Sequence, residues 1–412
     1  MGINSNKIVN ANNVNTMIHK SKNDFIELLF LLYGQQGRQL KVKNSIYEGK
    51  FNGKSYPFVH SYLSFLLMKL LNNMHLTCPF WKNKIKFTKS ITDYKTSYKS
   101  LSGVYAVSSD VLPKGFDLAC IVSTVPTEKE VQKRMFPHTL MKKLCDHFNV
   151  IILKTKCHHL CFTFSSVLCK SGLHMKSSLL ENKRMSSQID KWKTLQKQKK
   201  VSKALCYSLG EIPKLTLHKY LQRSTFEKHE WKSILFQLCF TMSLLQKEIP
   251  GFVHHNLSPK HIYLKKVPHG GQFVYKVGNT KYYVPNCGYI VKIIPSSYSY
   301  SHNLYDNELV HNEEHQKTMG LHANNTQFYD FHHFFNVLFY CPNVPSFIKN
   351  SIKKWIQFVS NVNTPQIVNM RLRSSHEVQN KHDFHILLHS NFLNNFKKVQ
   401  KNKIIFYPHI TL

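Results

Sequence analysis

The chain of 412 residues is long enough for two or three packed units. Hydrophobic residues at 42% and aromatic residues at 13% exclude a wholly disordered protein, a collagenous repeat and a small disulfide scaffold. The net charge is +34, from 56 Lys and Arg against 22 Asp and Glu, so the surface should attract nucleic acid, anionic lipid or acidic protein. An AT-rich coding bias would account for part of this charge, because the codons for Lys are AT-rich.

Residues 1–94 are predicted to form a partly helical N-terminal extension. Apolar residues recur at helical spacing in residues 24–33 and 57–73, and Pro57 suits a first helical position, where no backbone donor is needed. We see no apolar run long enough for a transmembrane segment and no secretory leader. The ten cysteines lack paired spacing, which indicates free thiols in a reducing compartment.

Residues 95–208 are predicted to form a small β-rich lobe. A helical candidate at 128–147 lies among β-like runs, which favours an α+β arrangement. These runs cover residues 103–107, 118–122, 150–153 and 160–164. Residues 170–204 are polar, Ser-rich and basic, so we expect an exposed insertion there.

Residues 209–412 are predicted to form a larger helical lobe. The longest helix, 229–248, places Trp231, Leu238 and Leu245 on one face, which is typical of a buried helix. Further helices are expected at residues 216–222, 328–339 and 344–359, and short strands at residues 262–264 and 289–294. The order of a β-rich part followed by a helical part predicts an α+β protein with two lobes.

The most informative segment is 251–264, Gly-Phe-Val-His-His-Asn-Leu-Ser-Pro-Lys-His-Ile-Tyr-Leu, directly after the long helix. It resembles the catalytic loop of eukaryotic protein kinases, H-R-D-L-x-x-x-N followed by an apolar strand. In this comparison His254 takes the place of the structural His, Asn256 that of the catalytic Asp, and His261 that of the metal-binding Asn. An Asn amide cannot act as a general base, so the resemblance implies a retained frame with altered chemistry.

A second match lies downstream of this loop. In the kinase family a metal-binding Asp-Phe-Gly follows a hydrophobic strand, whereas here residues 288–294 are followed by Pro295-Ser-Ser, so the resemblance implies that Pro295 stands at a metal-ligand position without binding metal. Asp330, in Phe-Tyr-Asp-Phe-His-His, matches a buried carboxylate that braces the catalytic loop. Glu211 lies in a segment that resembles the hinge between the lobes. Residues 273–294 are similar to an insertion in serine/threonine kinase-like proteins of large DNA viruses.

The β-rich part matches the kinase pattern less closely. A glycine-rich phosphate loop requires about three glycines near the first strand, and only Gly103 is there. Residues 118–122 stand where the lysine-bearing strand of the family lies, but they contain no Lys. The Glu of the family's regulatory helix would fall near Pro137.

The resemblance therefore implies an α+β, bilobal protein-kinase-like fold with an N-terminal helical extension, an N-lobe over 95–208 and a C-lobe over 209–412. It implies a pseudokinase of a large DNA virus, without a cofactor, that binds or scaffolds a protein partner. Its expected place is the host cytoplasm, the nucleus or the virion. One alternative is a divergent active serine/threonine kinase that transfers the ATP γ-phosphate, with magnesium held by another carboxylate such as Asp306 or Glu308.

Other kinds of site stay open from the sequence. The basic segments 82–99 and 170–203 carry aromatic residues beside their lysines, so the second alternative is a nucleic-acid-binding or virion packaging protein. Cys157-His-His-Leu-Cys161 offers soft metal ligands, but a half-buried strand would show the same pattern. His311-Asn-Glu-Glu-His315 matches the H-x-x-E-H metallopeptidase motif. We predict core packing for the first of these two motifs, an exposed loop for the second, and no metal site.

Overall fold

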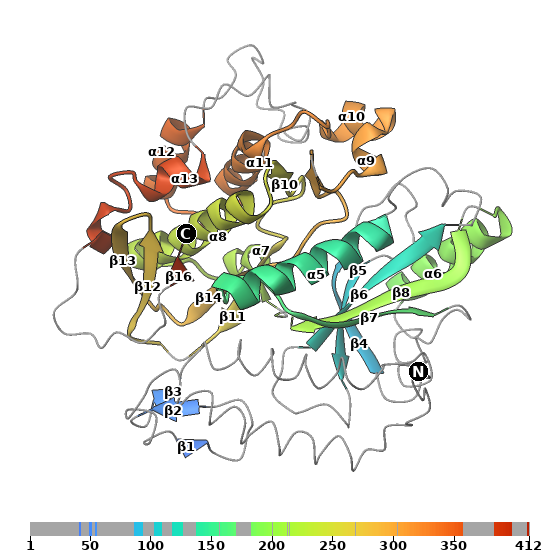
Figure 1. Ribbon diagram of the computed structural model, residues 1–412, viewed down its shortest axis with the longest axis horizontal. Helices are drawn as coiled ribbons and strands as arrows, with labels where there is room; N and C mark the ends of the chain where they lie inside the picture. Colours follow the sequence, from blue (N-terminus) through green and yellow to red (C-terminus); the bar gives the residue numbers. More distant parts are fainter. Residues whose placement is uncertain are drawn as a thin grey trace, which may run out of the picture.

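The computed structural model describes residues 41–42, 49–51, 54–55, 86–93, 103–108, 118–126, 137–155, 157–169, 183–199, 201–211, 213, 215–267, 269–302, 304–356, 383–397 and 410–411 (Figure 1). Among these residues, no helix combines the length and the apolar character needed to cross a bilayer. The helices predicted over 24–33 and 57–73 lie outside the described residues. A small sheet is described near them, with strands β1 (Lys41–Val42), β2 (Gly49–Phe51) and β3 (Lys54–Ser55).

A five-stranded antiparallel sheet forms the β-rich part, in the spatial order β4-β5-β6-β8-β7. The predicted strands at 103–107 and 118–122 are confirmed. The first strand pairs with the second although it precedes residue 95, so the sheet begins inside the segment that we expected to be a helical extension. The strands are β4 (Lys86–Asp93), β5 (Gly103–Ser108), β6 (Leu118–Pro126), β7 (Thr163–Cys169) and β8 (Val201–Glu211).

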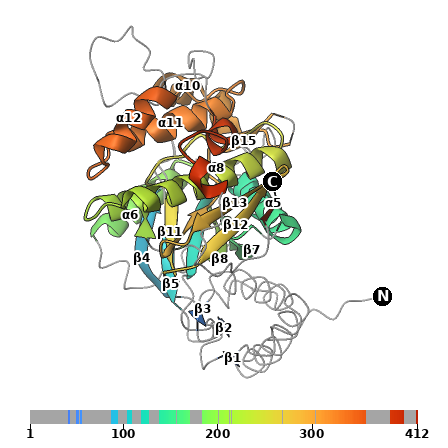
Figure 2. The same cartoon turned by 90° about the vertical axis from the view of Figure 1, so that its left-hand side faces the viewer.

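Helix α5 (Pro137–Thr155) packs against this sheet (Figure 2). Leu144, Phe148 and Ile151 are buried at helical spacing, whereas Val150 is 58% exposed. The strand predicted at 150–153 is therefore wrong. The run is rich in β-branched residues, but burial of one helical face outweighs this local preference. A helix does follow the strand predicted at 118–122, but it lies between β6 and β7 and runs from Pro137 to Thr155, beyond the predicted end at residue 147.

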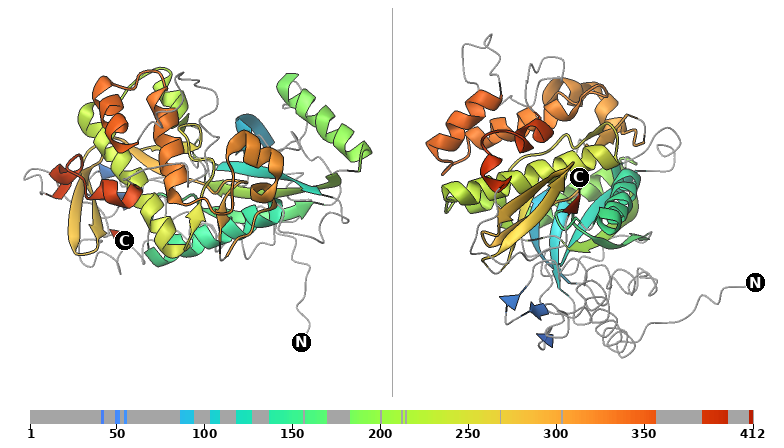
Figure 3. Two further views of the ribbon diagram at one scale, coloured as in Figure 1. Left: turned by 90° about the horizontal axis from the view of Figure 1, so that it is seen from above. Right: turned by 60° about the vertical axis from the view of Figure 1, so that its left-hand side comes forward.

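The segment that we expected to be an exposed insertion, 170–204, contains helix α6 (Lys183–Lys197) and the start of β8. Ile189 and Trp192 are 3% and 4% exposed, and α6 contacts β8 (Figure 3). The expectation of a wholly exposed insertion is wrong for this helix, because two apolar side chains anchor it to the core.

The helical part is built around α8 (Lys228–Glu248), which confirms the longest predicted helix. Glu227 and Glu230 form a capping box that satisfies backbone N–H groups at its start. Figure 1 shows α8 running through the middle of this part, with α11 (Gln327–Phe339), α12 (Ser346–Trp355) and α13 (Phe384–Leu388) on one side of it. Helix α7 (Leu217–Leu221) lies on the other side, and the 3₁₀ helix η2 (Asn394–Lys397) follows α13 in the chain.

Two small sheets lie on the opposite side of α8, and a further pair of short strands lies beside α11. Gln237 fixes α8 to one of these sheets, because its Oε1 accepts from Val291 N at 2.9 Å and its Nε2 donates to Tyr289 O at 3.3 Å. One sheet has the order β14-β11-β9, a second has the order β13-β12-β16, and β10 pairs with β15. The strands are β9 (Leu215–Thr216), β10 (Phe252–Val253), β11 (Ile262–Lys266), β12 (Gln272–Val277), β13 (Thr280–Pro285), β14 (Tyr289–Ile293), β15 (Tyr300–Ser301) and β16 (Ile410–Thr411).

The loop between α5 and β7 joins the β-rich part to the helical part. Leu160 forms a parallel bridge with Ile293 of β14. Cys161 N donates to Ile293 O at 3.0 Å, and Ile293 N donates to His159 O at 2.8 Å. The two parts thus share backbone hydrogen bonds, and the whole is an α+β fold, as predicted.

The cysteines differ from the sequence-based expectation at one residue. Cys169, at the end of β7, is disulfide-bonded. The other described cysteines carry free thiols and are buried. Burial raises the pKa of the Cys157 thiol to about 11, so this thiol is protonated at neutral pH.

Candidate functional site

The loop of residues 254–261 joins β10 to β11 and is held by Asp330 of α11. Asp330 Oδ2 accepts from His254 N at 2.6 Å, and its Oδ1 accepts from His255 N at 2.8 Å. His255 has a φ of 58°, in the left-handed region that a residue with a Cβ rarely adopts. Asp330 is fully buried, and this burial raises the pKa of its carboxyl to about 7. The carboxylate therefore stabilises a strained turn from within the core.

His254 is buried and neutral. Its Nε2 donates to Ile294 O at 3.0 Å, and its Nδ1 accepts from Asn256 N at 3.3 Å, which defines a single tautomer. Burial lowers the pKa of His254 to about 4. The imidazole thus joins the loop to the residue that follows β14.

His255 occupies the position of the family's Arg and is also neutral. Its Nδ1 donates to Tyr298 O at 2.9 Å, and its Nε2 accepts from Asn325 Nδ2 at 3.2 Å. Burial lowers the pKa of His255 to about 3. Without a positive charge, this side chain cannot attract a phosphate as an Arg would.

Asn256 and His261 contact each other at the positions of the family's catalytic Asp and metal-binding Asn. Asn256 Nδ2 donates to His261 Nε2 at 3.2 Å, and His261 Nδ1 donates to Ser258 Oγ at 3.0 Å. The two residues are 4% and 8% exposed. The pair contains neither a carboxylate base nor an anionic ligand for a hard cation such as Mg²⁺.

The segment that follows β14 gives no carboxylate at the next position. Pro295 is buried and has neither a ligand atom in its side chain nor a backbone N–H. His254 Nε2 bonds to Ile294 O, next to Pro295, and Asp330 holds the same loop from α11. The segments that carry Asn256, His261 and Pro295 are therefore joined through His254. Glu211 lies elsewhere, at the end of β8 opposite Leu118.

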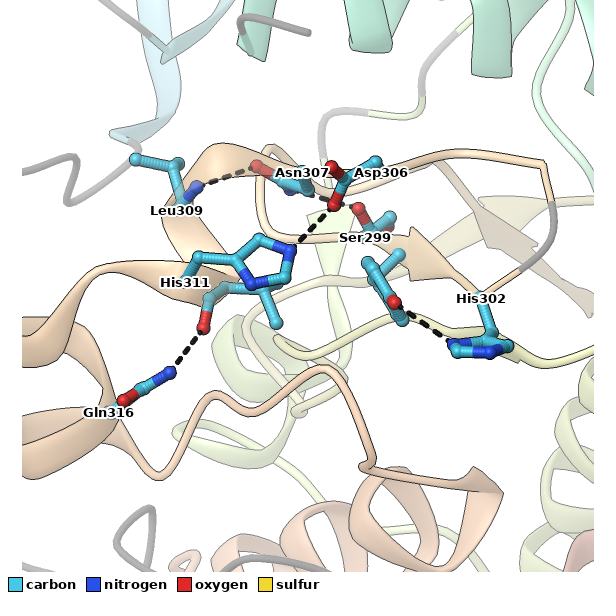
Figure 4. A network of polar contacts seen from close by, with 9 residues as sticks. Ser299, His302, Asp306, Asn307, Leu309, His311 and Gln316 are labelled. Atoms are coloured by element: carbon cyan, nitrogen blue, oxygen red, sulfur yellow. Dashed lines mark hydrogen bonds and ion pairs between the residues drawn. The ribbon is translucent and has the colours of Figure 1, made fainter. Parts of the chain in front are cut away.

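Asn307 organises the chain after Pro295 (Figure 4). Its Nδ2 donates to Ser297 O and to Ser299 O, both at 2.9 Å, and its Oδ1 accepts from Leu309 N at 3.0 Å. The side chain is fully buried, and it caps helix α9 (Glu308–His311). One amide thus satisfies three backbone groups. The sequence reasoning missed this residue, although Asn directly before Glu-Leu-Val-His is a helix-start signal.

Replacing Asn307 by Ala should lower the free energy of unfolding by about 2–3 kcal/mol, because two buried carbonyls lose their donors. Urea denaturation monitored by circular dichroism measures this loss. Asn312, an exposed N-cap whose side chain accepts from His315 N, is the matched control, and Asn312→Ala should cost about 1 kcal/mol or less. Equal losses in the two variants would contradict the role of Asn307 as a buried organiser.

The H-x-x-E-H motif does not form a metal site. His311 ends α9 and its Nε2 contacts Asp306 Oδ1 at 2.7 Å, whereas His315 belongs to α10 (Glu313–Met319) and its Nδ1 donates to Leu309 O at 3.1 Å. The two imidazoles therefore do not share one helix face. Asp306, one of the two carboxylates named as magnesium ligands in the alternative of an active kinase, is 57% exposed and paired with His311.

The Cys157-to-Cys161 motif is buried in the core. His159 Nδ1 donates to Val291 O at 2.9 Å, and its Nε2 accepts from Tyr275 OH at 2.8 Å. Both ring nitrogens of His159 are thus already hydrogen-bonded within the protein. Throughout the described ranges, no group of three or more His, Cys, Asp or Glu side chains is arranged to hold a metal ion.

An apolar cluster lies between the sheet and the catalytic-loop-like segment. It joins side chains of β5, β6 and α5 to Tyr263 of β11 and to Ile294, and none of its members is more than 4% exposed. The cluster consists of Val104, Ala106, Ala119, Ile121, Met141, Cys145, Cys161, Tyr263 and Ile294. Strand β6 contains no Lys and helix α5 contains no Glu, so these two elements cannot supply the Lys–Glu ion pair of an active kinase. Sequence reasoning missed this cluster because its members come from six separate segments.

Comparisons with known proteins agree with the motifs. No protein-family model matches the chain. A protein of Acanthamoeba polyphaga mimivirus described as a "putative serine/threonine-protein kinase" is 24% identical over 190 residues, which cover 43% of this chain and 40% of that protein. The chain thus spans about two fifths of the length of this curated relative.

Among solved structures, the autoinhibited serine kinase domain of the giant muscle protein titin aligns with 78% of this chain and 84% of its own, at 12% identity and a TM-score of 0.37. An overlap at this TM-score does not by itself define the fold. The viral relative and the order of the described elements do support the resemblance predicted from the catalytic-loop motif. Over part of its length the chain is thus similar to a viral protein described as a putative serine/threonine kinase, and its α+β order of elements is the one that the kinase resemblance implied.

Proposed function

We propose that this chain is a catalytically inactive, kinase-like binding or scaffolding module. The observation that carries the proposal is the hydrogen-bonded pair of Asn256 and His261, together with Pro295. Phosphoryl transfer by kinases depends on positioning and on magnesium ions held by an Asp and an Asn, with a second Asp to accept the hydroxyl proton. Here all three positions lack a carboxylate, and a neutral amide cannot accept that proton at neutral pH.

The apolar cluster around Tyr263 supports the same proposal. Bound nucleotide needs polar partners for its phosphates and a cation to neutralise them. Tyr263 and Ile121 are 0% and 2% exposed, and they pack against α5 and Ile294 instead. Opening this cluster would expose apolar area at a cost of about 25 cal/mol per Å². We therefore propose that the protein does not bind magnesium–ATP between its sheet and β11.

What the chain retains suits a binding surface. Asp330 fixes the strained loop and Asn307 fixes the segment after Pro295, so both present a constant shape without a phosphate or a metal. A preorganised surface loses less conformational entropy when it binds a partner. We place this partner, a protein, inside the infected host cell or in the virion, because the curated relative is viral.

The test uses the purified full-length chain, magnesium–ATP and a generic acceptor protein. We expect no thermal stabilisation by magnesium–ATP, because the proposed protein does not bind it. A nucleotide that did bind, at 100 times its Kd, would add about 2.7 kcal/mol to the free energy of unfolding. We also expect transfer from radiolabelled ATP to stay at the level of a buffer control. Robust transfer that Asn256→Ala abolishes would overturn the proposal and establish the alternative, a divergent serine/threonine kinase.

Contaminating kinases are the main source of a false signal, and a pair of variants controls for them. Transfer that persists in both Asn256→Ala and Asp330→Asn would come from a contaminant. ATP binding without transfer would leave the inactive assignment intact and would contradict only the filled site around Tyr263. A direct comparison is Tyr263→Ala, which opens that cluster; nucleotide binding that appears only in this variant would identify Tyr263 as the residue that excludes it.

A further inference from the structure

Helix α12 carries a lysine-rich face that no described carboxylate neutralises. The helix buries Ile348, Ile352 and Trp355 on one side. Lys353 and Lys354 are exposed on the other side, and Lys349 is partly exposed at its edge. The sequence from 331 to 356 contains no Asp, Glu or Arg. Figure 2 shows α12 on the outside of the helical part, beyond α11.

Lysines on two helices lie over aromatic rings next to this face. The Nζ atoms of Lys349 and Lys353 are 5.8 and 5.7 Å from the ring centroid of Phe339, within the range of a cation–π interaction. On α8, Lys228 lies 6.0 Å from the ring of Phe347 and Lys232 lies 5.2 Å from that of Phe392. We name these four lysines and three phenylalanines the lysine–aromatic surface.

Among the described residues, the carboxylates that flank these elements are engaged elsewhere. Glu227 and Glu230 bond to backbone N–H groups in the capping box of α8, and Glu227 also contacts His229 at 3.4 Å. Asp383 caps α13 and accepts from Gln327 Nε2 at 3.1 Å. Burial, and the charge of Lys228, lower the pKa of Lys232. The fold thus holds like charges close together, which costs free energy that a bound anion would return.

The chemistry of the surface favours a phosphate polymer over an acidic peptide. Lys acts as a point charge that neutralises a phosphate without a fixed geometry, so these lysines suit a phosphate backbone in any register. Aromatic rings among basic side chains are typical of proteins that stack unpaired bases. We propose that the lysine–aromatic surface binds single-stranded nucleic acid through its phosphate backbone, without sequence preference. This inference does not depend on whether the chain transfers phosphate.

Fluorescence anisotropy with a labelled oligothymidylate, measured on the full chain between 50 and 200 mM salt, tests the proposal. The variant Lys349→Gln/Lys353→Gln removes two phosphate contacts. Its affinity should fall roughly ten-fold, and the slope of log K against log salt should decrease in magnitude by about 1.4, because each contact with a single strand contributes about 0.7. The variant Phe339→Leu should weaken binding without changing that slope.

The control is Lys142→Gln/Lys143→Gln, which removes the same charge from two exposed positions of α5. Its affinity should stay within about two-fold of the unmodified chain, and its salt slope should not change. An equal loss in control and test variants would assign binding to the overall charge and overturn the proposal. Unchanged binding in the α12 variant would overturn it as well. So would competition by polyglutamate as strong as that by oligothymidylate at equal charge, which would identify an acidic protein as the partner. Thermal melting checks that each variant is folded, and the single variant Lys353→Gln replaces the double one if that variant is not.

Discussion

Replacing Asp330 by Ala should lower the free energy of unfolding by about 3–5 kcal/mol, the range observed when one partner of a buried charged interaction is removed. The backbone N–H groups of His254 and His255 would lose their acceptors inside the core. His255 would also keep a φ of 58° without the bond that holds it there. Urea denaturation monitored by tryptophan fluorescence and by circular dichroism measures the change.

Two further variants separate this role from a general effect of removing a carboxylate. Asp330→Asn keeps one oxygen acceptor but turns an amide donor towards the second N–H, so its loss should be smaller than that of Asp330→Ala yet exceed about 1 kcal/mol. Asp306→Ala removes an exposed carboxylate that is paired with His311 and should cost about 1 kcal/mol or less. A similar loss for Asp306→Ala and Asp330→Ala would show that Asp330 does not brace the loop.

Acidification from pH 6.5 to 5.5 should destabilise the fold by about 3 kcal/mol, and the loss should grow further towards pH 5. The cause is a set of fully buried histidines. Burial lowers the pKa of His254 to about 4 and those of His255 and His159 to about 3, and it lowers the pKa of His158 well below its usual value. Unfolding returns each of them to about 6.5.

The direction of this effect follows from proton binding. Below pH 6.5 the unfolded chain takes up protons on these histidines and the folded chain does not, so each costs about 1.4 kcal/mol per pH unit until its folded pKa is reached. Asp330 acts in the opposite sense, because its folded pKa of about 7 exceeds its unfolded value of about 3.9 and the folded state holds that proton over the same interval. Near pH 5.5 the four histidines take up about four protons when the chain unfolds and Asp330 releases one, so the net uptake is about three protons.

Urea midpoints measured between pH 7.5 and 5 test this prediction. The variant His159→Gln should reduce the pH slope by about 1.4 kcal/mol per unit. His269→Gln, at an exposed position, is the matched control for the loss of an imidazole. A slope that is the same in all three proteins would mean that the buried histidines do not control acid stability.

Sequence patterns predicted the elements whose signals are local. Helix α8 was readable because a helical repeat of apolar residues ends at a Pro-Gly turn, and β11 and β14 because short apolar runs are bounded by loop residues. The same approach wrongly predicted a strand at 150–153. The β-branched residues of this run favour a strand, but the packing of Leu144 and Phe148 extends a helix through it. Helix α6 was not predicted, because only two buried residues anchor it and two are too few to give a periodic signal.

The candidate site was predictable to a smaller extent. The loop motif placed Asn256 and His261 near each other because they are five residues apart. The bonds of Asp330 to His254 and His255, which are 76 and 75 residues away from it, were predicted only through the family resemblance. The acceptor of the His255 ring proton, Tyr298 O, and the carbonyl acceptors of the Asn307 amide depend on tertiary packing, which no spacing in the sequence encodes.

The backbone hydrogen bonds between Ile293 and the loop of His159 and Cys161 bear on how the protein can be divided. Dividing the chain near residue 209, at the proposed boundary between the lobes, would separate β14 from the loop of His159 and Cys161. The C-terminal piece would then carry an unpaired edge of β14, and the N-terminal piece would carry the unpaired loop. Gly210 tightens the same junction, because a Cβ at that position would lie 2.5 Å from Phe162 O. Each half expressed alone would therefore present an open strand edge suited to pairing with another chain, and aggregation is the expected result. The halves should recover a common fold only when they are produced together.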